Sequence, residues 1–406
     1  MTGVRTLARM NKSCSPFIHV NEKHFERSLL KYRRNSRNGL YLWFFFSIAM
    51  ILTVLMENGM VTTALAKTSA TIEKQTSQLA GNVAAPATGG VSESDIFGTL
   101  EEIGNFFTVY NPAGIKISME EYGDHRQALE SLKVGRLDFA FVSFISLNDS
   151  YVNDGEVQVL PFAIQSVCII LNINNSLTNA NITLDLRTLI QIFNGSITYW
   201  NDTRIESLNP TISLPDQEIV IVVRQDISDM DRVLSKSFSM IDAGWRDAHR
   251  NASKWRTTIG SLPNSRIIKV AKDTQMAQMV ASTPYSLGYS SLLAASKRKN
   301  QIAVIRTNTH NILPSKDSLE LIMNVENLPR SKALSVIDTS SIISRSNYGI
   351  YPLSEFVYVA FRPHNMSTCS GALSTYIYLN WIITSNLASA LLMDKGLVHI
   401  NTKWKE

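Results

Sequence analysis

The stretch EIVIVVRQDISDMDRVLSKSF, residues 218–238, contains the clearest structural pattern of this chain. It opens on an almost continuous apolar run at 218–223, which is typical of a buried strand. Apolar residues then recur at helical spacing up to Phe238, and either Ser228 or Asp229 can cap the helix that they predict. A strand, a polar turn and a helix in this order predict one unit of a layered α/β fold.

The same alternation of strand and helix patterns continues on both sides of this unit. Besides 218–223, the predicted strands are 115–119, 137–143, 157–164, 165–173, 267–270, 287–289, 302–305 and 355–361, and the predicted helices are 96–107, 125–134, 186–193, 274–282 and 370–393. Thr183 is the predicted cap of the helix at 186–193. The helix at 370–393 is apolar, but its Ser, Thr and Asn content favours a core helix over a membrane span. The whole pattern predicts α/β layers with mostly parallel sheets.

Charge is distributed unevenly along the 406 residues, which carry 39 basic and 34 acidic side chains and a net charge of +5. Residues 1–39 contain nine basic side chains and only Glu22 and Glu26 as acids, so this segment is +7 and the remainder is −2. A basic surface over the whole chain is therefore excluded, and nucleic acid is not an expected partner. A hydrophobic fraction of 45% is typical of a globular chain with a full core.

An apolar segment follows the basic tail and ends at Ala66. Its length at 40–66 and its aromatic start predict a single transmembrane helix, with the alternative of a buried core helix. The positive flank predicts a cytosolic tail and an outer C-terminal part, which is the topology of a type II signal anchor. Cleavage of a signal peptide near Ala66, giving a secreted protein, is the alternative. The Ser, Thr, Gly and Gln content of 67–91 predicts a flexible stalk.

Sequons support an extracellular or lumenal location for the long C-terminal part. The Asn-X-Ser/Thr matches that follow Ala66 begin at Asn148, Asn174, Asn181, Asn194, Asn201, Asn251 and Asn365. Each match alone is common, but seven together favour a glycosylated domain. Cys168 and Cys369 then face an oxidising space, where they either pair or remain two buried thiols.

Three stretches resemble the periplasmic phosphate-binding proteins of bacterial uptake systems. They are LDLRTLIQIFNGSITYWNDTRIESLNP (184–210), LPDQEIVIVVRQDISDMDRVLSKSFS (214–239) and STPYSLGYSSLLAAS (282–296). The resemblance extends over roughly 94–403 and implies a two-lobed, periplasmic-binding-protein-like α/β fold of type II. Its two crossing hinge strands would be 162–171 and 351–361. Lobe one would comprise 92–165 plus 351–403, and lobe two 166–350.

The resemblance also implies an anion site in the cleft between the lobes. The family pattern Arg-x-Asp-Gly-Ser-Gly-Thr matches this chain at Arg224, Asp226 and Ser228. Arg224 would donate to an oxyanion, Asp226 would accept a phosphate proton or orient Arg224, and Ser228 would donate from the helix start. Phe97 and Ser143 occupy two further matching positions, and Ser143 stands where the family has a proton-accepting Asp. The alternative is a surface Arg–Asp pair beside an ordinary N-cap serine.

Several positions depart from that pattern. The loop glycines are replaced by Ile227 and Asp229, and the loop threonine by Met230. A side chain obstructs the close backbone approach that glycine permits, and Asp229 adds negative charge beside the expected anion. A second loop, 120–125, carries three acids and no serine, and is expected to be either part of the cleft or a solvated loop.

No catalytic motif stands out, because the chain has no HExxH, P-loop, CxxC or GxSxG sequence, and its seven histidines are scattered. We therefore expect no enzyme activity, no metal and no cofactor, and we expect histidines at the surface. Two functions remain open. One is a membrane-anchored solute-binding domain that holds phosphate or a related small anion. The other is a degenerate binding-protein fold that serves as a structural, adhesion or protein-interaction ectodomain without a small ligand.

Overall fold

The computed structural model describes residues 85–92, 94–111, 113–143, 156–173, 181–225, 227–248, 262–324, 342, 348–362 and 368–400. The predicted tail 1–39, the predicted anchor 40–66 and most of the predicted stalk lie outside these residues. Within the described ranges, no helix combines the length and the apolar character that crossing a membrane requires.

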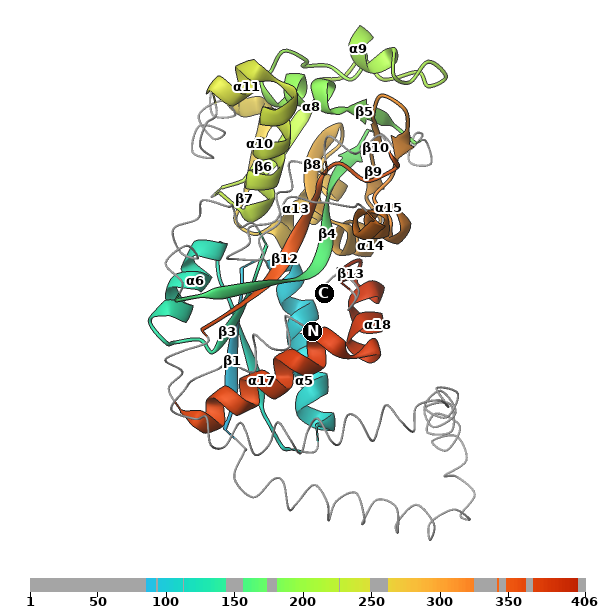
Figure 1. Ribbon diagram of the computed structural model, residues 1–406. Coiled ribbons are helices and arrows are strands. Elements are labelled where there is room, and N and C mark those ends of the chain that lie inside the picture. The colour runs from blue at the N-terminus through green and yellow to red at the C-terminus, as the bar shows by residue number, and fades with distance from the viewer. Residues whose placement is uncertain are drawn as a thin grey trace, which may run out of the picture.

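A continuous path of hydrogen-bonded strands runs through the molecule in the order β2-β1-β3-β12-β4-β8-β6-β7, with helices packed on its faces (Figure 1). We call the part built on β2, β1, β3, β12 and the start of β4 the first half, and the part built on the end of β4, β8, β6 and β7 the second half. The elements of the first half are β1 (Ala87–Val91), α5 (Ser94–Tyr110), β2 (Ile117–Glu121), α6 (His125–Lys133), β3 (Phe139–Val142), β12 (Ser354–Phe361), α17 (Cys369–Thr384), α18 (Asn386–Asp394) and β13 (Val398–His399).

Strand β4 (Gln158–Asn172) belongs to both halves. The other elements of the second half are β5 (Thr183–Asp185), α8 (Leu186–Phe193), α9 (Thr203–Glu206), β6 (Val220–Arg224), α10 (Asp229–Ile241), α11 (Ala243–Ala248), η6 (Asn264–Arg266), β7 (Ile267–Val270), α13 (Asp273–Ser282), β8 (Ser286–Ser291), α14 (Leu292–Lys297), β9 (Gln301–Ile302), β10 (Val304–Arg306), β11 (Asn311–Ile312), α15 (Lys316–Glu320) and η7 (Leu321–Asn324). Strands β11, β10 and β5 form a separate small sheet.

Strands β4 and β12 join the two halves. The prediction of two strands at 157–164 and 165–173 was wrong, because the chain continues without a break as the single strand β4. Its start pairs with β12 and its end pairs with β8, both antiparallel. The expectation of mostly parallel pairing is met only in part. Strand β1 pairs parallel with β2 and β3, and β6 pairs parallel with β7 and β8, but β4 and β12 pair antiparallel with each other, β12 with β3 and β4 with β8, so the sheet is mixed.

The first half is held together by helices packed on opposite faces of its sheet. Ile96, Leu100, Ile103 and Phe107 form the buried face of α5, as their spacing predicts. Consecutive residues of β3 alternate between the two core clusters, because successive side chains of a strand point to opposite faces. The C-terminal helices α17 and α18 cover the same face as α5, with Phe107 in contact with Tyr378.

The prediction of a flexible stalk that reaches Val91 was wrong at its C-terminal end. Residues Ala87–Val91 form β1, a largely buried strand between β2 and β3. Two glycines of β1 explain both its close packing and why the sequence pattern predicts a flexible stalk here. A Cβ atom at Gly89 would lie 2.3 Å from the Phe139 ring, and one at Gly90 would lie 2.5 Å from Leu137. Only glycine fits at these two positions, and a strand that contains two glycines has the same amino-acid composition as a flexible linker.

Three further predictions need correction. The cap of α8 is Asp185, whose carboxylate accepts from the backbone N–H of Thr188 at 2.7 Å, whereas Thr183 lies in β5. The helix at 370–393 is two helices, because Ser385 ends α17 and caps α18. Strand β2 begins two residues later than the pattern at 115–119 predicts.

Candidate anion-binding site

The turn between β6 and α10 lies where the two halves meet. Ser228 is the N-cap of α10, and its Oγ lies 3.3 Å from the backbone N–H of Asp231. The Asp231 carboxylate in turn accepts from the backbone N–H of Ser228 at 2.7 Å. This reciprocal capping box means that Ser228 and Asp231 together satisfy the start of the helix.

Arg224, the last residue of β6, is buried behind this turn. Its Nη1 lies 2.9 Å from Oδ1 of Asp273, at the start of α13, and the two side chains are 6% and 5% exposed. The Tyr289 hydroxyl donates to the Asp231 carboxylate and accepts from the backbone N–H of Arg224. Burial raises the pKa of Asp231 and holds the pKa of Tyr289 well above its usual range. Arg224 therefore belongs to a buried polar network within the second half.

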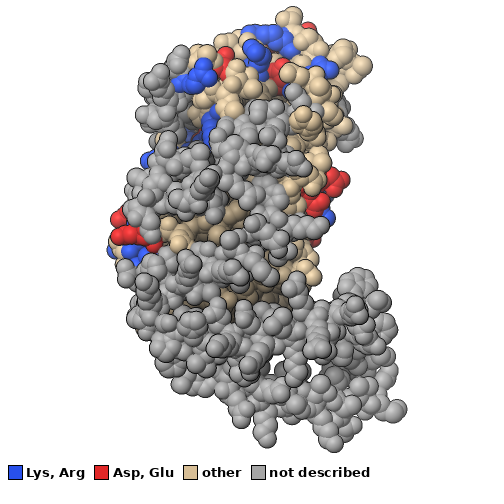
Figure 2. Space-filling model, in the orientation of Figure 1, with Lys and Arg blue, Asp and Glu red and all other residues tan. Residues whose placement is uncertain are grey.

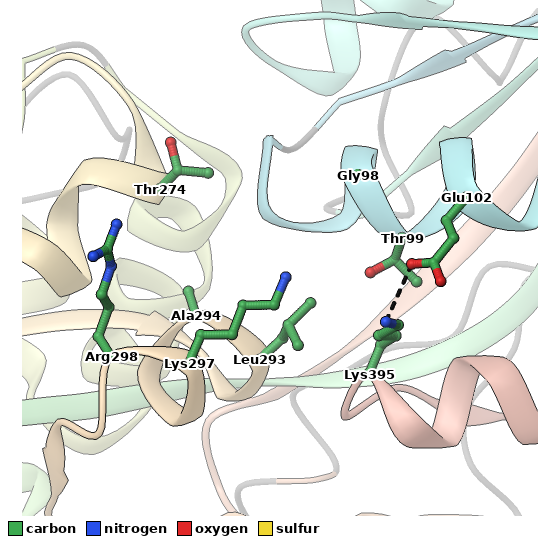
Figure 3. Close-up of a pocket in the computed structure, with 9 residues that line it drawn as sticks. All are labelled: Gly98, Thr99, Glu102, Thr274, Leu293, Ala294, Lys297, Arg298 and Lys395. Atoms are coloured by element: carbon green, nitrogen blue, oxygen red, sulfur yellow. Dashed lines mark ion pairs between the residues drawn. The ribbon is translucent and has the colours of Figure 1, made fainter.

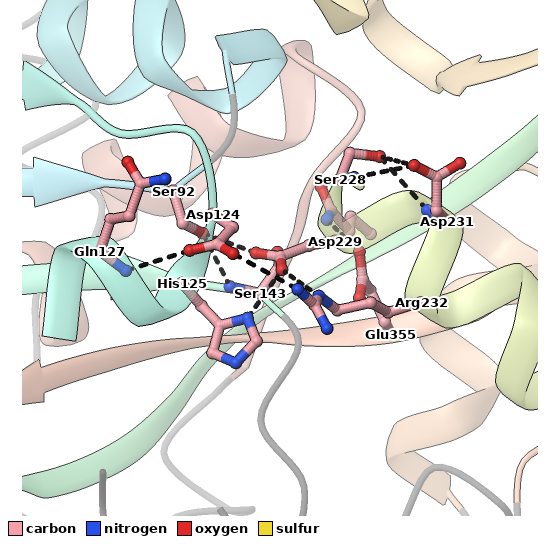
Figure 4. A network of polar contacts seen from close by, with 11 residues as sticks. Ser92, Asp124, His125, Gln127, Ser143, Ser228, Asp229, Asp231, Arg232 and Glu355 are labelled. Atoms are coloured by element: carbon pink, nitrogen blue, oxygen red, sulfur yellow. Dashed lines mark hydrogen bonds and ion pairs between the residues drawn. The ribbon is translucent and has the colours of Figure 1, made fainter. Parts of the chain in front are cut away.

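Asp229 is the first residue of α10, and its carboxylate points away from its own helix toward the first half (Figure 4). Its Oδ2 accepts from the hydroxyls of Ser92 at 3.1 Å and Ser143 at 3.0 Å, and its Oδ1 lies 2.7 Å from Nδ1 of His125. Nε of Arg232 lies 3.5 Å from the same Oδ1. Asp229 itself is fully buried.

The three first-half partners meet because of the sheet topology. Strands β1 and β3 are parallel neighbours, and Ser92 and Ser143 each follow the carboxyl end of one of them. The backbone N–H of Ser143 donates to Ser92 Oγ at 3.3 Å, which fixes the two hydroxyls side by side. His125 begins α6, directly after its N-cap Asp124. The carboxyl ends of strands and the starts of helices are where α/β folds place ligands.

An ionised carboxylate only accepts hydrogen bonds, so Ser92, Ser143 and His125 all donate to Asp229. All three are at most 3% exposed. Charge-assisted bonds of this kind are what makes burial of a carboxylate tolerable. A second ion pair between the halves, from Nη2 of Arg232 to Asp124 at 3.3 Å, lies beside them. These buried donors form a site that suits an anion, and the anion they surround is the Asp229 carboxylate of the protein itself.

The predicted ligand residues are only partly brought together here. Ser143 contacts the central carboxylate, Ser228 caps α10, and Arg224 lies in the network behind the turn. Phe97 is half-buried in α5 and packs against the core of the first half. Asp226 lies outside the described residues.

Two residues of the site were missed by the reasoning from sequence. Ser92 was overlooked because the stalk was drawn up to Val91, which hid the strand end that positions its hydroxyl. His125 was expected at the surface and is 1% exposed. Its position directly after Asp124, a good N-cap residue, was the available signal that it begins a helix. In the acidic loop before it, Glu120 and Glu121 are exposed, as the solvated interpretation expects.

An opening between the halves lies apart from this centre, between α5, the end of α18 and helices α13 and α14 (Figure 3). It has a volume of about 250 Å³ and is lined by Gly98, Thr99, Glu102, Thr274, Leu293, Ala294, Lys297, Arg298 and Lys395. Lys395 pairs with Glu102 at 3.1 Å, and Lys297 and Arg298 are exposed. Its cations are thus solvated or already paired, in contrast to the buried donors around Asp229.

The coloured residues on the face shown in Figure 2 form no broad field of one sign. Basic and acidic side chains are interspersed on the coloured part of the face in Figure 2. Among the described residues, no group of three or more His, Cys, Asp or Glu side chains is placed to hold a metal ion. Anion binding would therefore depend on local donors rather than on a general positive potential.

Comparison with known proteins agrees with this architecture. Two solved structures share the fold: a high-affinity periplasmic phosphate-binding protein with bound phosphate (TM-score 0.54, 15% identity, 79% of this chain and 92% of that one) and a candidate phosphate ABC transporter substrate-binding protein from Clostridium perfringens (TM-score 0.51, 13% identity, 78% and 100%).

Relatives by sequence fall into two kinds. The phosphate-binding protein PstS of Methanocaldococcus jannaschii is 23% identical over 279 residues, which is 65% of this chain and 69% of that protein. A candidate serine/threonine-protein kinase/receptor, R831 of Acanthamoeba polyphaga mimivirus, is 24% identical over 283 residues, which is 66% of this chain but only 16% of the viral protein. The family model of the PBP superfamily domain matches residues 59–385, most of the chain. The chain therefore belongs to the PBP superfamily, in which it is similar to the phosphate-binding proteins.

Proposed function

We propose that this chain is a solute-binding domain that holds a small anion, such as phosphate or a phosphoester, at the centre now filled by the Asp229 carboxylate. The observation that carries the proposal is the convergence of Ser92, His125 and Ser143 on one buried, negatively charged group. Three separate elements of the first half supply these donors, and α10 of the second half supplies the group between them. An anion is the ligand chemistry that such a set of donors fits.

Relatives support the same chemistry. The curated archaeal relative is named as a phosphate-binding protein, and one structural neighbour contains bound phosphate. Proteins of this class bind and release their ligand without converting it, so we propose a binding role rather than catalysis. Closure of the two halves, which β4 and β12 connect, would report that the site is filled.

A thermal-shift series on the full chain in detergent tests the proposal with inorganic phosphate, sulfate and a set of phosphoesters. A ligand at about 100 times its Kd stabilises the folded state by about 2.7 kcal/mol, which for a domain of roughly 310 residues raises the Tm by about 4 °C. The double variant Ser92→Ala/Ser143→Ala should lose the shift, and Ser296→Ala, at an exposed serine of α14, should keep it. No shift with any member of the series would refute the proposal.

A second candidate function is a degenerate binding fold that acts as a protein-interaction ectodomain without a small ligand. One observation favours it: the Asp229 carboxylate already satisfies the donors that an anion would need. This candidate expects unchanged Tm values across the whole anion series, so the same experiment separates the two functions.

We further propose that residues 40–66 anchor the domain in a membrane, with 1–39 in the cytosol and the PBP domain outside. The basic flank before the apolar segment and the sequons after it support this topology. The kinase/receptor name of the viral relative supports a signalling use of such a domain. Asn181 and Asn194 are exposed and Asn201 is half-buried. Expression in a glycosylating host should give a glycosidase-sensitive mass increase that falls when Asn181 and Asn194 are changed to Gln, and no glycan at all would contradict the topology.

A further inference from the structure

We infer that Asp229 is a built-in ligand: its carboxylate occupies the anion centre, ties the two halves together without a solute, and must be displaced before an external anion can bind. This inference rests on the proposed function and adds the control of the same site. Asp229 would therefore compete with an external anion for the same donors.

The contacts of Asp229 are not those of an ordinary acid at a helix start. Acidic residues in a first turn usually stay at the surface, where they interact favourably with the helix dipole. In α10, Ser228 and Asp231 already form the capping box. Asp229 takes no part in that box. It is fully buried, and although Nε of Arg232 on the same helix lies 3.5 Å from its Oδ1, both of its oxygens also reach across the boundary between the halves.

The partners of Asp229 match what a bound anion would contact. Two hydroxyls and one imidazole nitrogen of the first half lie within 3.1 Å of its oxygens. Nε of Arg232 approaches from the second half at 3.5 Å. Every oxygen of the carboxylate is thus engaged, and both halves contribute to the centre as they would around a solute.

Simultaneous occupation by Asp229 and an external anion is excluded by space and by charge. Both would require the hydroxyls of Ser92 and Ser143, and two like charges at hydrogen-bond distance repel strongly in a dry site. A tethered group competes with an effective concentration of about millimolar or more. If the effective concentration is about ten times the dissociation constant of the carboxylate for the centre, its removal should increase the affinity for phosphate by about tenfold.

The test compares the full chain with Asp229→Gly in calorimetric titrations with inorganic phosphate and a phosphoester. The matched control is Asp317→Gly, because Asp317 is an exposed acid in the first turn of α15 and has no contact with the centre. We expect about tenfold tighter phosphate binding by Asp229→Gly and no change in the control. Asp229→Ala, which also removes the carboxylate but restricts the backbone more than glycine does, replaces the glycine variant if that chain does not fold.

Hydrogen–deuterium exchange supplies a readout that does not depend on a ligand. If Asp229 holds the halves together, Asp229→Gly should exchange faster at the end of β3, at Ser92 and at the start of α6, and added phosphate should restore protection. Exchange in Asp317→Gly should match the unmodified chain at these places.

The outcomes separate the inference from the proposed function. Equal phosphate affinity in both chains overturns the built-in ligand and leaves the solute-binding function standing. Binding by the variant alone supports the built-in ligand and overturns phosphate binding by the unmodified chain. No binding by either chain overturns the proposed function and, with it, the displacement of Asp229 by an external anion. The exchange measurement then decides only whether Asp229 ties the two halves together, and unchanged exchange would overturn that as well.

Discussion

Replacement of Arg224 distinguishes a ligand residue from a structural one. A guanidinium reserved for a ligand would be lost at little cost in the absence of anion. The structure instead places Nη1 of Arg224 2.9 Å from Oδ1 of Asp273, with both side chains almost completely buried. Removal of one partner of a buried ion pair leaves an uncompensated charge and typically costs about 3–5 kcal/mol. For a domain of roughly 310 residues, Arg224→Ala should lower the Tm of the anion-free protein by about 5–8 °C.

The assay is a thermal melt without phosphate or sulfate in the buffer, read by circular dichroism. Arg187→Ala, at an exposed arginine of α8, serves as the control and should melt within about 1 °C of the unmodified chain, since surface substitutions cost little. The double variant Arg224→Met/Asp273→Leu should recover much of the loss, because replacing both members of a buried pair by apolar residues is often nearly neutral. A melting temperature for Arg224→Ala equal to that of the control would refute the assignment of Arg224 to a structural network.

Two further predictions follow from packing and burial. Gly89→Ala should destabilise the protein by about 1–3 kcal/mol, because the new methyl group would meet the Phe139 ring. Gly98→Ala should instead stabilise the protein by about 0.5–1 kcal/mol, because Gly98 lies in helix α5 with open space around it. Chemical denaturation of the two variants measures both changes. Burial raises the pKa of Asp231 in the folded chain above its ordinary value of 3.8. The folded state therefore binds the Asp231 proton more tightly than the unfolded state does. As a result, the contribution of Asp231 to stability falls as the pH rises from 3.8 to the pKa of the folded state. Asp231→Asn should remove that slope from melts recorded between about pH 3.5 and 6, and an unchanged slope would contradict the assignment.

Several individual helices and strands could be predicted from the sequence, because the patterns that mark them involve only neighbouring residues. The buried face of α5, the strand β7 and the start of α10 at Ser228 all follow from spacing and capping over a few neighbouring residues. Strand β1 could not be recognised in this way. Its glycines are required by the nearby rings and side chains of β3 and its flanking loop, and that requirement exists only after the chain has folded.

The centre of the site was hidden for the same reason. His125 and Asp229 are 104 positions apart, and Ser92 and Asp229 are 137 apart. Spacing along the chain carries no information about such pairs. The resemblance to the phosphate-binding family points to the turn that carries Asp229, and within it to Arg224 and Ser228, which the structure places in a buried ion pair and at a helix cap.

Two departures from the family pattern complement each other at this centre. The resemblance places a proton-accepting Asp where this chain has Ser143, and a glycine where it has Asp229. With a carboxylate at both positions, two like charges would stand about 4 Å apart and repel by about 4 kcal/mol at the effective dielectric constant of a protein site. A serine donates instead, and its hydroxyl lies 3.0 Å from the Asp229 carboxylate. The Asp229 carboxylate brings no proton that needs an acceptor, so a hydroxyl donor such as Ser143 fits it better than a second carboxylate would. Each residue alone would weaken a phosphate site, but together they form a hydrogen-bonded contact between the halves, as the inference of a built-in ligand expects.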